Sequence, residues 1–247
     1  MPDERAERGS RLGRGRDRRE TRLELAQRIA DAYGVVLILI LITFVVMMTL
    51  PPEGWGGRVT AVAVAGLTAI VALTSSDVRP GRVRLAAVVA VAAIAAAIIA
   101  ERIPSERLLG VAFGAVSILL AIAAITILRR VIVGATEVDF RTILGAVSVY
   151  ALLGLLFALF FFAVGRWTDS GFFAGVAEPR SSDYLFFSYT TLTTTGYGNL
   201  TPAGTVGQSF AVFEMLAGQI FLVTLVARLV SLWRPGARKP PVAGANV

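Results

Sequence analysis

The 247-residue sequence contains no cysteine and no histidine, and Lys239 is its only lysine. Without cysteine the chain has no disulfides and no thiolate nucleophile, and without both residues the usual zinc, haem and iron–sulfur ligand sets are missing. Histidine-based acid–base chemistry is excluded as well. No nucleophile is paired with a base elsewhere in the sequence. We therefore expect a protein that is not an enzyme, has no catalytic residues and needs no cofactor.

Charged residues are also scarce. They make up 17% of the chain, against 55% hydrophobic residues and a mean hydropathy of +0.71. These values are typical of a membrane protein. A membrane-spanning helix needs roughly 20 mostly apolar residues, and six stretches qualify. They lie at about 33–50, 59–75, 84–101, 107–129, 142–165 and 205–232, and the second is the weakest because it is short.

The basic residues are divided unevenly between the two sides of this predicted membrane. Of the 24 Lys and Arg residues, 19 fall in the terminal segments and in the loops on the same side, and five fall on the other side. Cytoplasmic loops are enriched in Lys and Arg. We therefore expect a multi-pass protein of the plasma membrane, surrounded by lipid, with both termini in the cytoplasm.

The basic segment 1–32 would also fit an arm that binds nucleic acid. Acidic residues interrupt its arginines, however, no aromatic residue lies between them, and a membrane span follows directly. We interpret the segment as a cytoplasmic tail that sets the orientation and ends, from about Thr21, in a short interfacial helix. No nucleic-acid partner is expected.

The segment SSDYLFFSYTTLTTTGYGNLTPAG, residues 181–204, lies between the fifth and sixth spans. Its apolar part, residues 184–193, is too short to cross the membrane. Ser181 or Ser182 can cap a helix here, and Asp183 in the first turn would complement the helix dipole. We predict a re-entrant pore helix that stops midway through the membrane and continues into a loop at residues 194–198.

In this loop, Thr194-Thr195-Gly196-Tyr197-Gly198, two glycines flank one aromatic residue. Extended backbone at membrane depth is tolerated only where it is buried in protein or lines a water-filled path. Glycine permits positive φ, which lets the carbonyls from Thr194 to Tyr197 turn toward one axis. Such carbonyls can replace the hydration shell of a monovalent cation. One chain offers too few oxygens around an axis, so the loop predicts a homotetramer.

The run TTLTTTGYGNLTP resembles the selectivity filter of potassium channels, and FFSYTTLTTTGYG resembles the pore helix and filter of the bacterial two-helix-pore channel family. The likeness extends over about residues 140–233. It implies a selectivity filter made of Thr194, Thr195, Gly196, Tyr197 and Gly198, with K⁺ bound at the first four as the permeant ion. It also implies a bacterial inner membrane as the location.

The sequence departs from the family's commonest pattern around the filter. Thr195 stands where Val is usual, Asn199 stands where Asp often follows the last glycine, and Phe187 stands where a Trp commonly packs against the filter tyrosine. We expect altered filter stability or inactivation more than lost selectivity, since the backbone oxygens are unchanged. The residues assigned to filter support are Phe186, Phe187, Thr190, Asn199 and Glu214.

Two residues of the sixth span have predicted roles in the pore. Gly218 is a candidate gating hinge, because glycine lets the lower half of the helix swing; the alternative is close packing against the fifth span. An ionised Glu214 inside the span would be expensive. We therefore expect Glu214 to form a hydrogen bond with the pore helix, near Thr190 or Thr191, in preference to tuning the potential of the cavity.

The predicted fold is an all-α membrane protein with six transmembrane helices and a re-entrant pore helix and filter loop between helices five and six. We divide it into a cytoplasmic tail and interfacial helix (1–32), a four-helix supporting domain (33–130), a pore domain (131–233) and a short cytoplasmic tail (234–247). The fourth span has no arginine between Arg107 and Arg129, so strong voltage dependence is not expected. Gating by a soluble ligand would need a separate regulatory subunit.

These observations predict a potassium-selective channel that conducts K⁺ passively down its electrochemical gradient. One alternative is a weakly selective monovalent cation channel, because the departures around the filter could widen it. The other is a non-conducting transporter or regulatory subunit that retains a filter-like loop.

Overall fold

The computed structural model describes residues 33–49, 55–75, 78–103, 105–134, 140–168 and 171–232. Over these ranges the chain is helical, and its extended structure is limited to an isolated bridge between Phe173 and Pro202. The predicted all-α class is therefore confirmed. The basic tail, its interfacial helix from Thr21 and the segment 234–247 lie outside the described residues.

Seven helices make up the described part of the chain. A helix at Tyr33–Thr49 comes first. The others are α2 (Trp55–Thr74), α3 (Pro80–Arg102), α4 (Glu106–Gly134), α5 (Phe140–Trp167), α6 (Ser181–Leu192) and α7 (Thr205–Leu232). Of these, α2, α3, α4, α5 and α7 are long and apolar enough to cross a membrane, whereas Tyr33–Thr49 is shorter. Five spans are thus supported by length and composition, and the full six-span arrangement stays a prediction.

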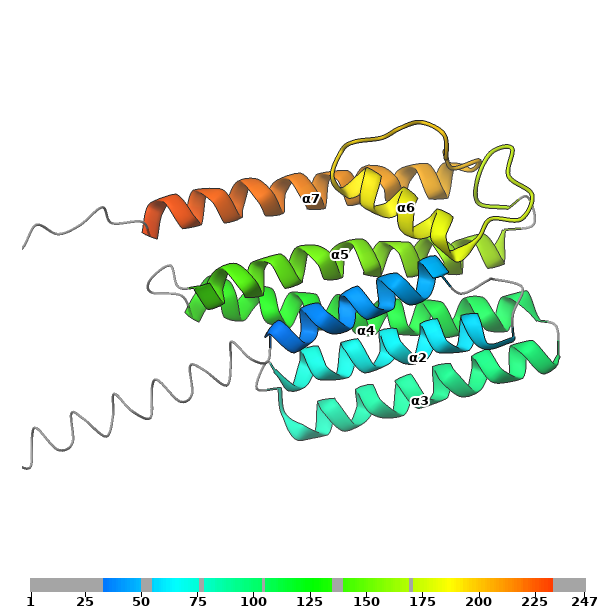
Figure 1. Ribbon diagram of the computed structural model, residues 1–247, viewed down its shortest axis with the longest axis horizontal. Helices are drawn as coiled ribbons and strands as arrows, with labels where there is room; N and C mark the ends of the chain where they lie inside the picture. The colour runs from blue at the N-terminus through cyan, green and yellow to red at the C-terminus, as the bar shows by residue number, and fades with distance from the viewer. Residues whose placement is uncertain are drawn as a thin grey trace, which may run out of the picture.

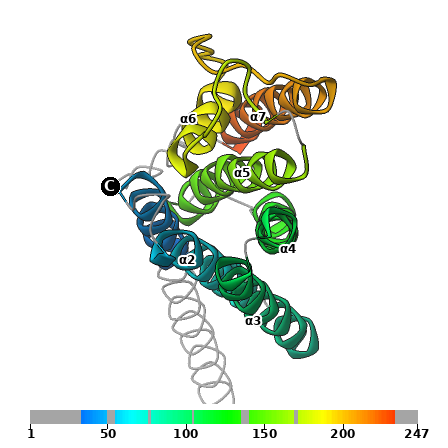
Figure 2. The ribbon, with the colours of Figure 1, turned by 90° about the vertical axis from the view of Figure 1, so that its right-hand side faces the viewer.

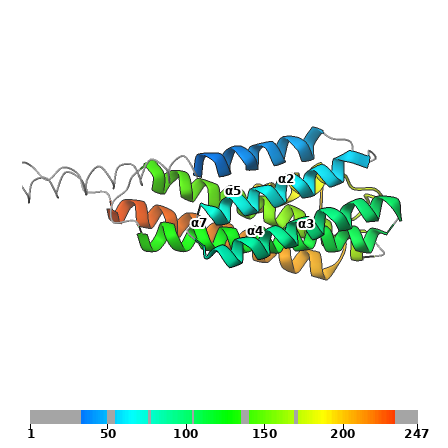
Figure 3. The same cartoon turned by 90° about the horizontal axis from the view of Figure 1, so that it is seen from below.

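The long helices run side by side along the length of the molecule (Figures 1 and 3). Figure 2 shows α5 between two groups of helices, with α6 and α7 on one side and α4, α2 and α3 on the other. The packing agrees, because α4 lies along α5, while α2 and α3 contact each other and α4. One face of α5 thus supports α6 and α7, and its other face joins them to the remaining helices.

Small residues bring the helices of the α2–α4 group close together. The buried face of α3 consists of alanines at positions 86, 90, 93, 97 and 100, spaced three or four residues apart. Where α4 meets α5, a Cβ added to Gly110 would lie 2.7 Å from Nε1 of Trp167. Because Gly110 has no side chain, the Trp167 indole can approach α4 and donate a hydrogen bond to the carbonyl of Arg107, at 3.2 Å. Packing of this kind is typical of helices in membranes.

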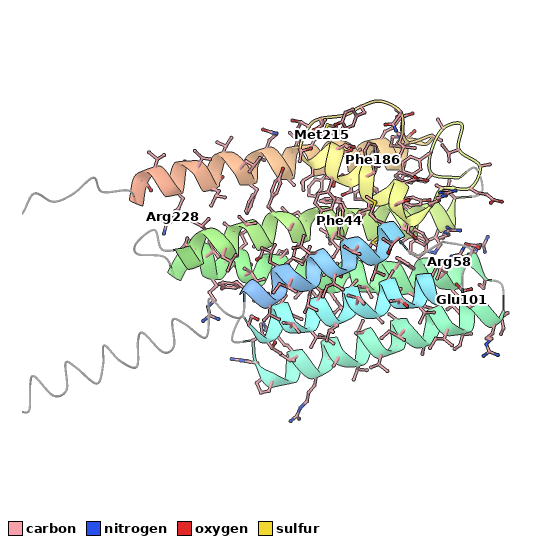
Figure 4. The ribbon with its side chains drawn as sticks, viewed as in Figure 1. Phe44, Arg58, Glu101, Phe186, Met215 and Arg228 are labelled. Carbon is pink, nitrogen blue, oxygen red and sulfur yellow. The ribbon has the colours of Figure 1, made fainter. Side chains whose placement is uncertain are left out.

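Ion pairs gather at one end of the bundle. Arg166 of α5 binds Glu106 of α4 at 2.7 Å, and Arg58 of α2 lies 3.9 Å from Glu101 of α3. Figure 4 places Arg58 and Glu101 at the end where α6 and its loops lie, and Arg228 at the opposite end of α7. These five charged side chains therefore lie toward the two ends of the bundle, where a membrane would meet water.

Candidate functional site

Helix α6 is the short helix predicted between the last two spans. Its 12 residues extend about 18 Å at 1.5 Å per residue, too little to cross a bilayer. The prediction that a serine caps it is wrong, because Arg180 is the N-cap and Ser181 and Ser182 lie in the first turn. Asp183 makes the capping contact: its carboxylate accepts a hydrogen bond from the Arg180 amide at 2.8 Å. Its predicted place at the positive end of the helix dipole is confirmed.

Tyr189 anchors α6 to α5. Its hydroxyl donates to the carbonyl of Ala151 at 2.7 Å. Its ring fills the space beside Gly154, where an added Cβ would lie 2.6 Å from the ring carbon Cζ. On the other side, the ring of Phe44, from the first helix, meets Tyr189 edge-on with centroids 5.6 Å apart. A glycine on α5 thus makes room for an aromatic side chain that fixes the position of α6.

The carboxyl end of α6 is held between α5 and α7. The Tyr150 hydroxyl of α5 donates to the carbonyl of Leu192 at 3.3 Å. From α7, a Cβ added to Gly218 would lie 2.6 Å from the same carbonyl oxygen. Gly218 therefore permits close packing, as one of the two readings of the sequence proposed, but against the end of α6 and not against the fifth span. Helix α7 runs unbroken through this residue.

Glu214 is completely buried, and its hydrogen-bond partner is Ser188. The Ser188 hydroxyl lies 2.5 Å from Oε1 of Glu214 and 2.7 Å from the carbonyl oxygen of Gly154. The prediction of a bond to α6 is correct, but the predicted partners Thr190 and Thr191 are not the ones used. The Thr190 hydroxyl instead donates to the carbonyl of Phe187, within its own helix, at 3.0 Å.

The loop after α6 has positive φ at every second residue: 58° at Thr194, 50° at Gly196 and 78° at Gly198. In an extended strand, successive carbonyls point to opposite sides. Alternating signs of φ instead keep successive peptide groups turned the same way. The glycines were expected to adopt such values, but Thr194 was not, because a β-branched residue at positive φ is a genuine outlier.

Hydrogen bonding in this loop is one-sided. The amides of Thr195 and Gly196 both donate to the carbonyl of Thr190, at 2.8 and 3.1 Å. Within the described part of the chain, the carbonyl oxygens of residues 194–197 accept no hydrogen bond. Residues 193–199 are all exposed on the single chain. The amides of Thr195 and Gly196 are thus turned back toward α6, and a row of backbone acceptors is left open.

Phe186 and Phe187 have different environments. Phe186 stacks on Tyr197, with centroids 5.7 Å apart and ring planes at 16°. Phe187 is buried in a cluster of aromatic side chains with Phe161, Phe172 and Phe173. Within the chain, Phe186 is therefore the aromatic partner of the loop tyrosine, and Phe187 belongs to the packing behind α6.

Threonine and glutamine side chains complete the surroundings of the loop. The hydroxyls of Thr193 and Thr195 lie 2.9 Å apart, and the Gln219 amide of α7 donates to the Thr194 hydroxyl at 3.4 Å. Asn199 is exposed just after the last glycine. Sequence reasoning did not identify Gln219. Its position one residue after the candidate hinge, on a span with few polar residues, was the available signal.

The segment before α6 is tied to the segment after the loop. The Ala174 amide donates to the carbonyl of Thr201 at 2.9 Å, and the Ala203 amide donates to the carbonyl of Phe172 at 2.8 Å. These bonds flank the bridge between Phe173 and Pro202. Both ends of the unit formed by α6 and the loop are thus held at the same place.

A family model described as an ion channel matches residues 155–234. The matched part begins within α5 and includes α6, the loop and α7. No curated protein and no solved structure matches the chain. The chain is a multi-pass membrane protein by the length and composition of its helices, and its similarity to the ion channel family over residues 155–234 supports ion conduction through a channel.

Proposed function

We propose that the chain forms a homotetrameric potassium channel, in which residues Thr194 to Gly198 of four copies make the selectivity filter. In this proposal K⁺ binds to the carbonyl oxygens from Thr194 to Tyr197, with the Thr194 hydroxyl at the inner end. Conduction is passive, and α6 is the pore helix, entering the membrane from outside and stopping at its centre.

The observation that carries this proposal is the one-sided hydrogen bonding of the loop. Backbone acceptors at membrane depth need partners, because each unsatisfied group costs several kcal/mol in an apolar medium. The carbonyls of residues 194–197 accept nothing from the described part of the chain. A row of such oxygens suits a dehydrated cation, which needs several oxygen ligands at once.

The surface of α7 supports assembly around an axis. Of its apolar window only 22% is buried, against 61% for α5. The exposed part includes two polar residues within the span, Gln219 and Thr224, and polar side chains that face lipid are unfavourable. A hollow of about 380 Å³ also remains between the loop and α7, bordered by Thr194, Gly198 and Met215. Neighbouring copies and a water-filled cavity would fill and solvate these surfaces.

The proposal extends to the remaining expectations from the sequence. Both termini lie in the cytoplasm, the membrane is the bacterial inner membrane, and residues 33–130 form a supporting domain without a strong voltage sensor. Asn199, Phe186, Phe187, Thr190 and Glu214 support the filter. Gly218 lies at the level where α7 could bend to gate the pore, and a separate subunit would supply any regulation by soluble ligands.

Flux measurements in liposomes test this function. Vesicles containing the purified chain and a K⁺ gradient should show an ionic flux that a Na⁺ gradient does not drive. Gly196→Ala should lower the K⁺ flux on the order of tenfold or more, because an L-residue is strained at φ of 50°. Gly175→Ala is the matched control, since Gly175 has φ of 74°, open space around it and a position outside the loop.

Each other outcome points to a defined alternative. Equal K⁺ and Na⁺ fluxes, both sensitive to Gly196→Ala, would favour the weakly selective cation channel. Absence of flux from a correctly folded tetramer would favour the non-conducting transporter or regulatory subunit. Equal losses in Gly196→Ala and Gly175→Ala would show that the loop has no special role in conduction.

A further inference from the structure

The buried contact between Ser188 and Glu214 does not contain enough hydrogens for its hydrogen bonds if Glu214 is ionised. A serine hydroxyl has one hydrogen to donate. Here it faces two oxygens at bonding distance, the Gly154 carbonyl at 2.7 Å and Oε1 of Glu214 at 2.5 Å. If Glu214 were ionised, only one of these contacts could be a hydrogen bond. In the other contact, two oxygens would face each other with no hydrogen between them.

A neutral carboxylic acid resolves this conflict. Its own hydrogen would lie between Glu214 and the Ser188 oxygen, which leaves the serine hydrogen for the Gly154 carbonyl. The second carboxyl oxygen, Oε2, has no partner within the described part of the chain. An unpaired carbonyl oxygen of a neutral acid costs far less than an unpaired oxygen of a buried carboxylate.

Among the residues that the structure describes, no cation lies beside Glu214 to stabilise its ionised form. Both Glu214 and Ser188 have no exposed surface. The titratable groups of the adjacent helices that interact electrostatically with the Glu214 carboxyl are Tyr150 of α5 and Tyr189 of α6. Tyrosines are neutral near pH 7. Each of them donates its hydroxyl hydrogen elsewhere, to Leu192 and Ala151. Ionisation would thus leave a buried charge without a counter-charge.

We infer that Glu214 is a protonated positioning residue that, through hydrogen bonds with Ser188, holds the pore helix α6 against both α5 and α7. The chain of hydrogen bonds runs from Glu214 in α7, through Ser188 in α6, to Gly154 in α5. Ser188 lies six residues before Thr194, the first filter residue. Holding this point of α6 fixes the carbonyl of Thr190, which receives the amides of the loop. The inference rests on the proposed function only for its effect on conduction.

Infrared difference spectroscopy of the reconstituted wild-type chain tests the protonation state directly. At pH 7 the wild-type spectrum minus that of Glu214→Gln should contain the C=O stretching band of a protonated carboxylic acid. Loss of an ionised carboxylate band in its place would overturn the inference. This reading needs no ion flux, so it stands apart from the proposed function, which fails if the wild-type chain passes no K⁺.

Three substitutions distinguish the hydrogen-bonding role of a neutral Glu214 from simple filling of space. Glu214→Gln keeps an uncharged side chain of similar size with an N–H to donate to Ser188, so its K⁺ flux and its preference for K⁺ over Na⁺ should stay within about twofold of wild type. Glu214→Ala and Ser188→Ala break the chain of bonds and should lower the K⁺ preference on the order of tenfold. A Glu214→Gln variant as impaired as Glu214→Ala would overturn the inference.

Ser117→Ala is the matched control. Ser117 is also a buried serine whose hydroxyl donates to a carbonyl of α5, that of Leu156 at 3.3 Å, but it lies on α4 and has no carboxyl partner. Its K⁺ preference should remain that of wild type. A loss of K⁺ preference equal to that of Ser188→Ala would show that any serine buried against α5 has the same effect. This result would contradict the proposed role of the Glu214–Ser188 hydrogen bond.

Discussion

The backbone of Gly218 in α7 touches the carbonyl of Leu192, the last residue of α6. The space for a side chain is absent, since an added Cβ would lie 2.6 Å from that oxygen and 2.9 Å from Cδ1 of Leu192. This contact connects the candidate hinge directly to the end of α6, so packing and hinge motion at Gly218 make different predictions.

Gly218→Ala should displace the end of α6 and cost about 1–3 kcal/mol of stability, as overpacking of a tight site does. If the glycine serves packing, the variant of the proposed channel loses preference for K⁺ over Na⁺, because the proposed filter begins two residues after Leu192. If it serves as a hinge, selectivity is unchanged and the open probability falls. Single-channel recording with K⁺ and Na⁺ on opposite sides measures both quantities.

The pairing of Phe186 with Tyr197 predicts separate effects for two neighbouring phenylalanines. Stacked aromatic pairs contribute about 0.5–1.5 kcal/mol beyond burial. Phe186→Leu should therefore shorten the open times of the channel up to about tenfold while the fold remains intact. Phe187→Leu, in the aromatic cluster, should lower the melting temperature of the protein instead. Shorter openings in Phe187→Leu alone would contradict this assignment.

Asn199 and Thr195 were singled out because they differ from the commonest filter pattern. Asn199→Asp should alter the open-time statistics or the rate of inactivation and leave the selectivity for K⁺ unchanged. Thr195→Val removes the 2.9 Å contact between the Thr195 and Thr193 hydroxyls, which is worth on the order of 1 kcal/mol. Single-channel recordings in which both variants match wild type would remove the role assigned to these side chains.

Gly154 predicts a large effect of adding one methyl group. In Gly154→Ala the Cβ would lie 2.6 Å from Cζ of Tyr189, so α6 must shift, with a loss of about 1–3 kcal/mol. Gly114→Ala is the control on α4, because its nearest neighbour would be Cβ of Ala163 at an ordinary 3.7 Å. Thermal unfolding of the two purified variants should show a lower melting temperature for Gly154→Ala and an unchanged one for Gly114→Ala.

The sequence predicted the helices well because membrane spans follow from length and hydropathy alone. The stretch assigned to 142–165 is Phe140–Trp167, and the last span at 205–232 is Thr205–Leu232. The short α6 was predicted because its apolar run is too brief to cross and Asp183 marks its beginning. Its N-cap was misassigned because Asp183 reaches back to the amide of Arg180, a contact that no residue preference at a cap reveals.

The contacts between helices could not be derived in the same way. Glu214 was expected to reach α6, but the choice of Ser188 depends on how α6 crosses α7, which a single sequence does not specify. The Tyr189 ring packs in the space beside Gly154, but the two residues lie far apart along the chain, so the sequence does not reveal their contact. Positive φ was predicted for the two loop glycines from their chemistry, whereas for Thr194 nothing in the residue type points to that conformation.

The edge-on contact between Phe44 and Tyr189 connects the first helix directly to α6. A change in bilayer thickness or tension that tilts the helix Tyr33–Thr49 would press on a ring that is also wedged beside Gly154. The force would reach α6 from its side, without first moving α7.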